Sequence, residues 1–248
     1  MIIECSKIIE IDYGCKSNTK CEVFLMKLLS VQMAIFSEES ISRPDLLFNE
    51  VNEKLGGLIN DMPTILNLPP DIPAEIPVVQ AKSTDGWINL NVSRSRIDLI
   101  ANFIYESEQS PLEALNSQKE TIQKFYKSVL NSITANRTGF ILTLFEPSTN
   151  NVKSVFEKYF SEKYTSKFVE ASTRVNKQNM RKSVVYNNIR SVEAATITVG
   201  AENIPGVLFQ LDINNALEPG KRINEDIVSY VVSQGVSNLS PEAVKEMI

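Results

Sequence analysis

The chain has 248 residues, of which 43% are hydrophobic and 22% charged, and its formal net charge is −5. This composition is that of a globular protein with one large domain or two small ones. The negative charge argues against a protein that coats nucleic acid with its whole surface. The absence of histidine excludes Ser-His-Asp and Cys-His catalysis and every histidine-bearing zinc site.

Cysteine usage and hydropathy indicate a reduced, cytoplasmic protein. The three cysteines, Cys5, Cys15 and Cys21, are too few for a four-cysteine zinc site and form no C-x-x-C pair. We therefore expect free thiols and no metal. The most apolar window, residues 23–35, contains Lys27 and Gln32 and is shorter than the roughly 20 residues that a membrane span requires.

Strands and one helix are predicted in the first third of the chain. Residues 1–36 are rich in strand-like patterns, and apolar residues at three- and four-residue spacing predict a helix near 44–60. Five prolines follow between residues 62 and 77. They predict an extended crossing or a sheet edge, because proline fixes φ and lacks an N–H donor.

A hairpin is predicted around Asp85 and Gly86. This pair accepts the positive φ angles of a type I′ turn, and the only tryptophan, Trp87, comes directly after it. Alternating apolar residues follow, namely Ile88, Leu90 and Val92. We therefore expect residues 78–93 to form two strands with one buried and one hydrated face.

The central part of the sequence predicts a long helix over residues 111–136. Ser110 and Glu113 have the spacing of a capping box, and Pro111 occupies the first turn. A buried strand follows at 139–145. The pattern then predicts a helix near 150–164, strands from 166 to 213, and helices near the C-terminus.

Strands and helices without regular β-α-β alternation indicate an α+β fold. We expect a mostly antiparallel sheet backed by the helix at 111–136, with further helices near 44–60, 150–164 and the C-terminus. The chain is predicted to be one domain, 1–248, either undivided or with two lobes, 1–108 and 109–248, joined near the central helix. The sequence shows no internal repeat with a period of roughly 20 to 50 residues.

The residues most suggestive of catalysis are Asp71, Gln80 and Lys82. Magnesium-dependent nucleases of the restriction-enzyme type place an aspartate at the start of one strand. An acidic or amide residue and a lysine, two residues apart, follow on the next strand. Glutamine lacks the charge that the metal requires, and prolines around Asp71 disfavour an interior strand. The alternative is that Asp71 is a solvated turn residue and Lys82 a surface charge of the hairpin.

A basic segment lies between residues 163 and 190, which hold seven basic residues, Lys163 among them, and one acid. Such a density of charge can bind phosphates and bases or an acidic protein surface, including that of a second copy. The third interpretation is a solvated strand face without a binding role. The candidate binding residues are Arg174, Lys177, Arg181, Lys182, Tyr186 and Arg190.

Short motifs resemble those of an uncharacterised, sporadically distributed group of bacterial proteins of about this length. They are "IPVVQAKSTDGWINLNVSR", the helix at 111–136, Arg174-Val175, Tyr186-Asn187-Asn188-Ile189 and "VLFQLDI". The resemblance implies a cytoplasmic bacterial protein from mobile or antiphage defence gene neighbourhoods, and it implies no particular activity. The layout of a sheet with a long helix is also similar to that of export chaperones of the SecB kind.

These observations predict a non-enzymatic binding protein whose basic segment docks an acidic protein or nucleic acid. No glycine spacing matches a nucleotide-binding loop, and we expect no catalytic residue, metal or cofactor. Apolar strands outnumber the helices available to cover them, so we also expect an oligomer or a protein partner at exposed sheet edges. The alternative function is a magnesium-dependent nuclease that uses Asp71, Gln80 and Lys82.

Overall fold

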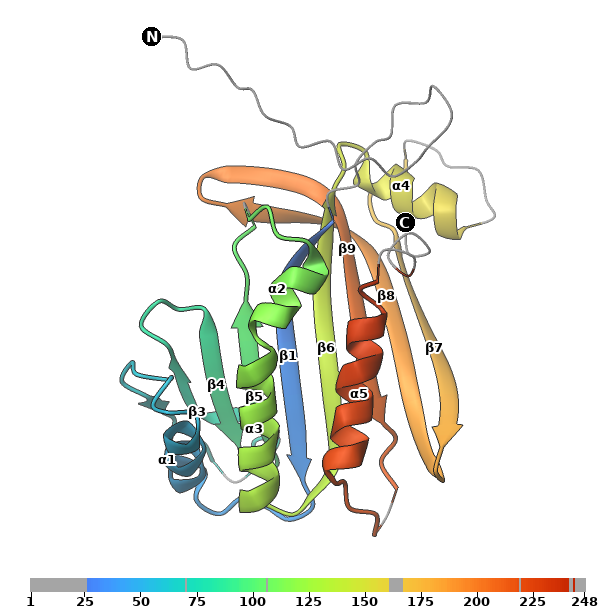
Figure 1. Ribbon diagram of the computed structural model, residues 1–248. Coiled ribbons are helices and arrows are strands. Elements are labelled where there is room, and N and C mark those ends of the chain that lie inside the picture. Colours follow the sequence, from blue (N-terminus) through green and yellow to red (C-terminus); the bar gives the residue numbers. More distant parts are fainter. Residues whose placement is uncertain are drawn as a thin grey trace.

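An antiparallel sheet runs through the computed structural model of the protein, which describes residues 26–69, 71–105, 107–160, 167–218, 220–240 and 243. The strands within these ranges are β1 (Lys27–Ser37), β2 (Thr64–Ile65), β3 (Pro77–Lys82), β4 (Ile88–Ser93), β5 (Arg96–Asn102), β6 (Ala135–Pro147), β7 (Ser172–Arg181), β8 (Val184–Val199) and β9 (Glu202–Asn215). They are hydrogen-bonded in the order β2-β3-β4-β5-β1-β6-β9-β8-β7 (Figure 1). The predicted α+β class with a mostly antiparallel sheet is confirmed.

The helices of the described ranges lie on one face of this sheet (Figure 1). They are α1 (Pro44–Lys54), α2 (Pro111–Ser117), α3 (Lys119–Ser132), α4 (Asn151–Tyr159) and α5 (Glu225–Ser237). None of these helices is long and apolar enough to cross a membrane. We call the sheet face opposite the helices the open face.

The prediction of one long helix over residues 111–136 is wrong. The segment forms α2 and α3, which are separated at Gln118, and its last residues begin β6. Gln118 has φ −102° and ψ 2°, in the bridge region of backbone space, so the chain changes direction there. The predicted capping box is confirmed, because Ser110 Oγ accepts from Glu113 N–H and the Glu113 carboxylate accepts from Ser110 N–H.

The helices predicted near 44–60 and 150–164 are present but shorter. α1 ends at Lys54, and Gly56 and Gly57 after it have φ angles of +78° and +71°, the left-handed conformation that commonly follows a helix end. α4 ends at Tyr159, and residues 161–166 lie outside the described ranges.

The two halves of the sheet repeat the same order of elements. β1, α1, the strands β3 to β5 and α2–α3 form the first half, and β6, α4, the strands β7 to β9 and α5 form the second. The sheet order outward from β1 is β5, β4, β3, and outward from β6 it is β9, β8, β7. This unit is much longer than the roughly 20 to 50 residues of solenoid repeats, and β2 is an addition to the first half.

The core lies between the sheet and the helices, centred on β1 and β6. Met33 of β1 lies opposite Phe140 of β6, and both side chains are fully buried. Gly235 of α5 contacts the Phe140 ring: a Cβ at this glycine would lie 2.4 Å from Phe140 Cδ1. The missing side chain therefore allows α5 to lie closer to the sheet than a larger residue would permit.

The predicted hairpin is confirmed, but its turn differs from the prediction. β3 pairs with β4, and the predicted inward side chains of β4 are buried. Only Gly86 of the turn has a positive φ, +76°, and its N–H donates to the Ser83 carbonyl at 2.8 Å. Asp85 instead accepts hydrogen bonds from Ser83 Oγ at 2.5 Å and Trp87 N–H at 3.0 Å. The type I′ turn is therefore wrong, because the glycine alone takes the left-handed conformation.

Replacing Gly86 by valine should destabilise the fold by about 1 to 3 kcal/mol, because a β-branched residue is strained at positive φ. Urea unfolding followed by circular dichroism measures the change. Gly86→Asn is the matched control, since asparagine tolerates this conformation, and it should cost less than about 1 kcal/mol. Equal losses in the two variants would contradict the assigned role of φ.

Replacing Gly235 by alanine should also destabilise, by about 1 to 3 kcal/mol, through overpacking against Phe140. The usual effect of this change inside a helix is a gain of up to about 1 kcal/mol, so the sign is diagnostic. In a double-mutant cycle, Phe140→Leu should cost less free energy of unfolding in the Gly235→Ala background than alone. Additive losses would show that the two positions do not touch.

Candidate functional site

The open face carries a row of hydrogen-bonded amides across its outer half. Gln178 Nε2 of β7 donates to Asn187 Oδ1 of β8 at 2.8 Å. Asn187 Nδ2 then donates to Asn214 Oδ1 of β9 at 2.9 Å, and Asn214 Nδ2 donates to Asp212 Oδ1 at 2.9 Å. These amides satisfy one another within the sheet, so the row connects β7, β8 and β9 through side chains as well as backbone.

Asp98 of β5 is the most deeply buried carboxylate of the described residues, with 2% of its surface exposed. Gln32 Nε2 donates to its Oδ1 at 3.0 Å, and Arg96 Nε donates to its Oδ2 at 2.8 Å. Burial raises the pKa of Asp98, and the charge of Arg96 and the two hydrogen bonds act in the opposite direction. Because both carboxylate oxygens are bonded across β1 and β5, this geometry is that of a structural ion pair.

α5 contacts two members of the predicted basic segment. The Arg181 guanidinium carbon lies 4.4 Å from the centroid of the Tyr230 ring. Tyr186 is buried and packs edge-on against the same ring, with centroids 4.5 Å apart. The sequence predicted Tyr186 as a binding residue, whereas the structure places it under α5.

Two further members of the segment also contact the C-terminal part of the chain. Lys182 Nζ lies 3.7 Å from Asp226 Oδ2, and Arg190 Nη2 donates to Asn238 Oδ1 at 3.1 Å. Both contacts hold the β7–β8 hairpin to the region of α5. Lys163 lies outside the described residues.

Arg174 and Lys177 are the remaining two of the six candidates, and both are exposed. They lie on β7 opposite Ser191 and Asn188 of β8, and neither makes an ion pair or side-chain hydrogen bond with a described residue. Successive strand residues point to opposite faces, so Lys177 shares the helix side with Arg181, whereas Arg174 lies on the open face. The structure therefore does not bring the six candidates into one patch.

The nuclease candidates do not converge either. Asp71 is exposed in a loop that Arg94 holds through the carbonyls of Pro69 and Ile72, beyond the end of β4. Lys82 ends β3 on the far side, beside the hairpin turn, and Gln80 lies between. Among the described residues, no group of three or more histidine, cysteine, aspartate or glutamate side chains could hold a metal. The three cysteines lie outside these residues.

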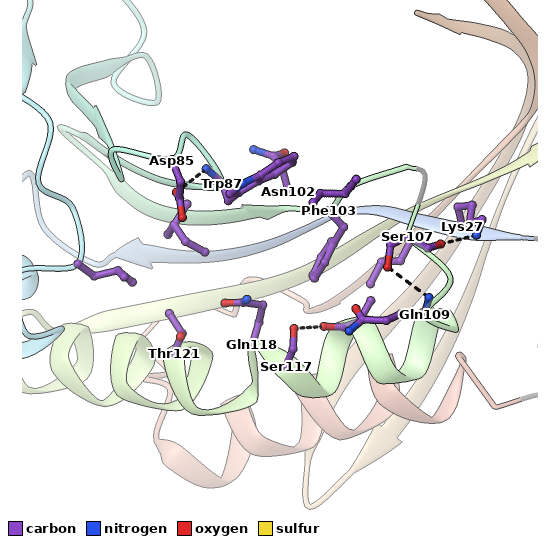
Figure 2. Close-up of a pocket in the computed structure, with 15 residues that line it drawn as sticks. Lys27, Asp85, Trp87, Asn102, Phe103, Ser107, Gln109, Ser117, Gln118 and Thr121 are labelled. Carbon is purple, nitrogen blue, oxygen red and sulfur yellow. Dashed lines mark hydrogen bonds between the residues drawn. The ribbon is translucent and has the colours of Figure 1, made fainter. Parts of the chain in front are cut away.

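A pocket of about 530 Å³ lies between the sheet and the α2–α3 pair (Figure 2). Its lining comes from the β3–β4 turn, the ends of β1 and β5, and the helix break at Gln118. Figure 2 shows Lys27 at one end and Asp85 at the other. The sequence places Trp87 directly after the predicted turn, but it does not indicate that this turn faces a helix break.

No protein-family model matches the sequence, and a search of curated proteins finds no similar chain. The resemblance to the sporadically distributed bacterial group stays a prediction.

The pKa of Asp98 predicts a pH dependence of stability. A carboxyl whose pKa is raised on folding binds protons more tightly in the folded state, so the contribution of Asp98 to the free energy of unfolding falls as pH rises from about 4 through the folded pKa. Asp98→Asn should remove this fall. Urea unfolding of both proteins at several pH values measures the difference. The pKa of Glu146 is also raised by burial, but this group is common to both proteins. Parallel curves would contradict the prediction.

Proposed function

We propose that the chain is a non-enzymatic binding protein that pairs an extended acidic segment of a partner protein with the outer edge of β7. The observation that carries the proposal is the position of β7 as the last strand of the sheet: it pairs with β8, and no other described strand lies beside it. The free backbone groups of such an edge are a template for one more strand. At the other edge, β2 has only two residues.

The side chains of β7 select the charge of the partner. The strand carries Arg174, Lys177 and Arg181 and no acidic residue. Val175 and Met180 lie between them and are 59% and 74% exposed. Acidic residues placed opposite the basic ones on an added strand would each contribute roughly 0.2 to 1 kcal/mol, and apolar residues would cover the exposed valine and methionine.

The directions of the basic side chains favour an added protein strand over a nucleic acid as the partner of β7. Arg181 lies on the helix side, over Tyr230, and strand alternation places Lys177 on that side and Arg174 on the other. Recognition of a phosphate backbone gathers positive charges on one surface. A strand added in the plane of the sheet instead projects its side chains to both faces, as β7 does.

A second copy of the chain is a poorer partner for this edge. Antiparallel pairing of two β7 strands keeps the helix sides of both copies on one face, and centred on Lys177 it would place the two Lys177 side chains opposite one another. Like charges directly opposite one another on paired strands are destabilising. The charge of the edge therefore favours an acidic partner over self-association.

Replacing Arg174 and Lys177 by glutamate should weaken binding of an acidic strand peptide at least about tenfold. The probe is a fluorescein-labelled peptide of about ten residues. It carries glutamate at the positions opposite Arg174, Lys177 and Arg181 of an antiparallel pair and valine opposite Val175 and Met180. Fluorescence anisotropy measures its affinity. The matched control is Lys124→Glu with Lys127→Glu on the exposed side of α3, which changes the net charge equally. This control should bind nearly as the parent does.

Equal weakening in both double variants would reduce the effect to net charge and overturn the proposal. A labelled single-stranded oligonucleotide of about 20 nucleotides provides a second probe. Binding of the oligonucleotide but not of the peptide, with dependence on Arg174 and Lys177, would replace the protein partner by a nucleic acid.

A further inference from the structure

The pocket between the β3–β4 turn and the α2–α3 break holds two opposite charges that are far apart. Lys27 Nζ donates to the Ser107 carbonyl at 2.5 Å, and no acid of the described residues pairs with it. Asp85 Oδ1 accepts from Ser83 Oγ and Trp87 N–H, which leaves Oδ2 without a partner among those residues. The same hydrogen bonds lower the pKa of Asp85, so its carboxylate is charged at neutral pH.

Polar side chains without hydrogen bonds in the described part of the chain line the space between these charges. Gln118 and Thr121 project from the helix side (Figure 2), and Asn102 lines the pocket from the end of β5. Gln118 lies at the helix break, where its backbone caps both helices: its N–H donates to the Leu115 carbonyl and its carbonyl accepts from Ile122 N–H. A carboxamide offers a donor and an acceptor, as a peptide group does, and therefore suits a ligand that contains peptide bonds.

Apolar side chains complete the pocket. Trp87 and Ile104 are 39% and 51% exposed, and Phe103 projects between the two walls (Figure 2). Large apolar side chains left exposed beside a concave polar surface are typical of ligand sites. They would cover an apolar side chain of a ligand.

We infer that this pocket binds a short peptide with free termini, with its ammonium group on Asp85, its carboxylate on Lys27 and an apolar side chain against Trp87 and Phe103. The volume of about 530 Å³ lies within the roughly 300 to 1,000 Å³ of small-ligand sites. This inference is independent of the proposed function, because the pocket belongs to the first half of the sheet and β7 to the second.

The separation of the charges excludes simpler ligands. A free amino acid carries both charges on one carbon, whereas Lys27 and Asp85 lie at opposite ends of the pocket (Figure 2). Lys27 is the only basic residue among the described residues that line it, so a phosphate dianion would lack the second cation that commonly binds it. A peptide of about three residues, at roughly 3.3 Å per residue, separates its charges along its length.

Isothermal titration calorimetry with Ala-Phe-Ala tests the inference. Acetylating the peptide N-terminus should weaken binding at least about tenfold in the parent, but not in Asp85→Asn, because the charge contact is then already lost. Asparagine keeps the oxygen that accepts from Ser83 and Trp87, so the turn is retained. Amidating the C-terminus should weaken binding at least about tenfold in the parent, but not in Lys27→Met. Lys124→Met on α3 is the control and should behave as the parent.

Three results would overturn the inference. The first is the absence of binding up to about 5 mM for Ala-Phe-Ala and for the same peptide with leucine, glutamine or serine in the centre. The second is an equal loss on terminal blocking in parent and variants, which would place the peptide elsewhere. The third is binding of free phenylalanine as tightly as of the tripeptide. Thermal unfolding of each variant shows whether it is folded.

Discussion

The pairing of β1 with β6 is the constraint on which the rest of the structure depends. These two strands join the repeated halves, and each carries a fully buried side chain, Met33 and Phe140, at the centre of the pairing. α5 rests on Phe140 through Gly235, and α3 lies over β1. Because each half adds its strands outward from this pair in matching order, the pairing also decides which strands become the edges. It places the long β7 at one edge and the short β2 at the other.

The repeat explains how one face of so large a sheet remains without helices in the described part of the chain. Asp98 of β5 lies opposite Ala34 of β1, and Asp212 of β9 lies opposite Ile141 of β6. Each aspartate therefore lies on the strand next to the central strand of its own half. Each also accepts a hydrogen bond from a side-chain amide. Polar groups that bond one another within this face have little to gain from burial under a helix.

Local patterns in the sequence predicted much of the fold and little of the candidate sites. The alternation of Ile88, Leu90 and Val92 identified a half-buried strand, and Ser110 with Glu113 identified a helix start, because both signals depend on neighbours in sequence. The helix break at Gln118 has no glycine or proline from which it could be predicted. The pocket combines Lys27, Asp85 and residues near Gln118, which only the order of strands brings together. The basic segment is continuous in sequence, but strand alternation places its side chains on two different faces of the sheet.

The charge of β7 accounts for both the exposure of this edge and the choice of its partner. Proteins commonly protect an edge strand by shortening it, as in β2, or by placing charged side chains on it. β7 has ten residues, so length does not protect it. α5 takes up Arg181 through Tyr230, whereas Arg174 and Lys177 stay exposed on opposite faces. Lys177 opposes pairing with an identical strand, and both charges favour pairing with an acidic one. The feature that keeps copies of the chain from stacking edge to edge is thus the same feature that would select a different partner.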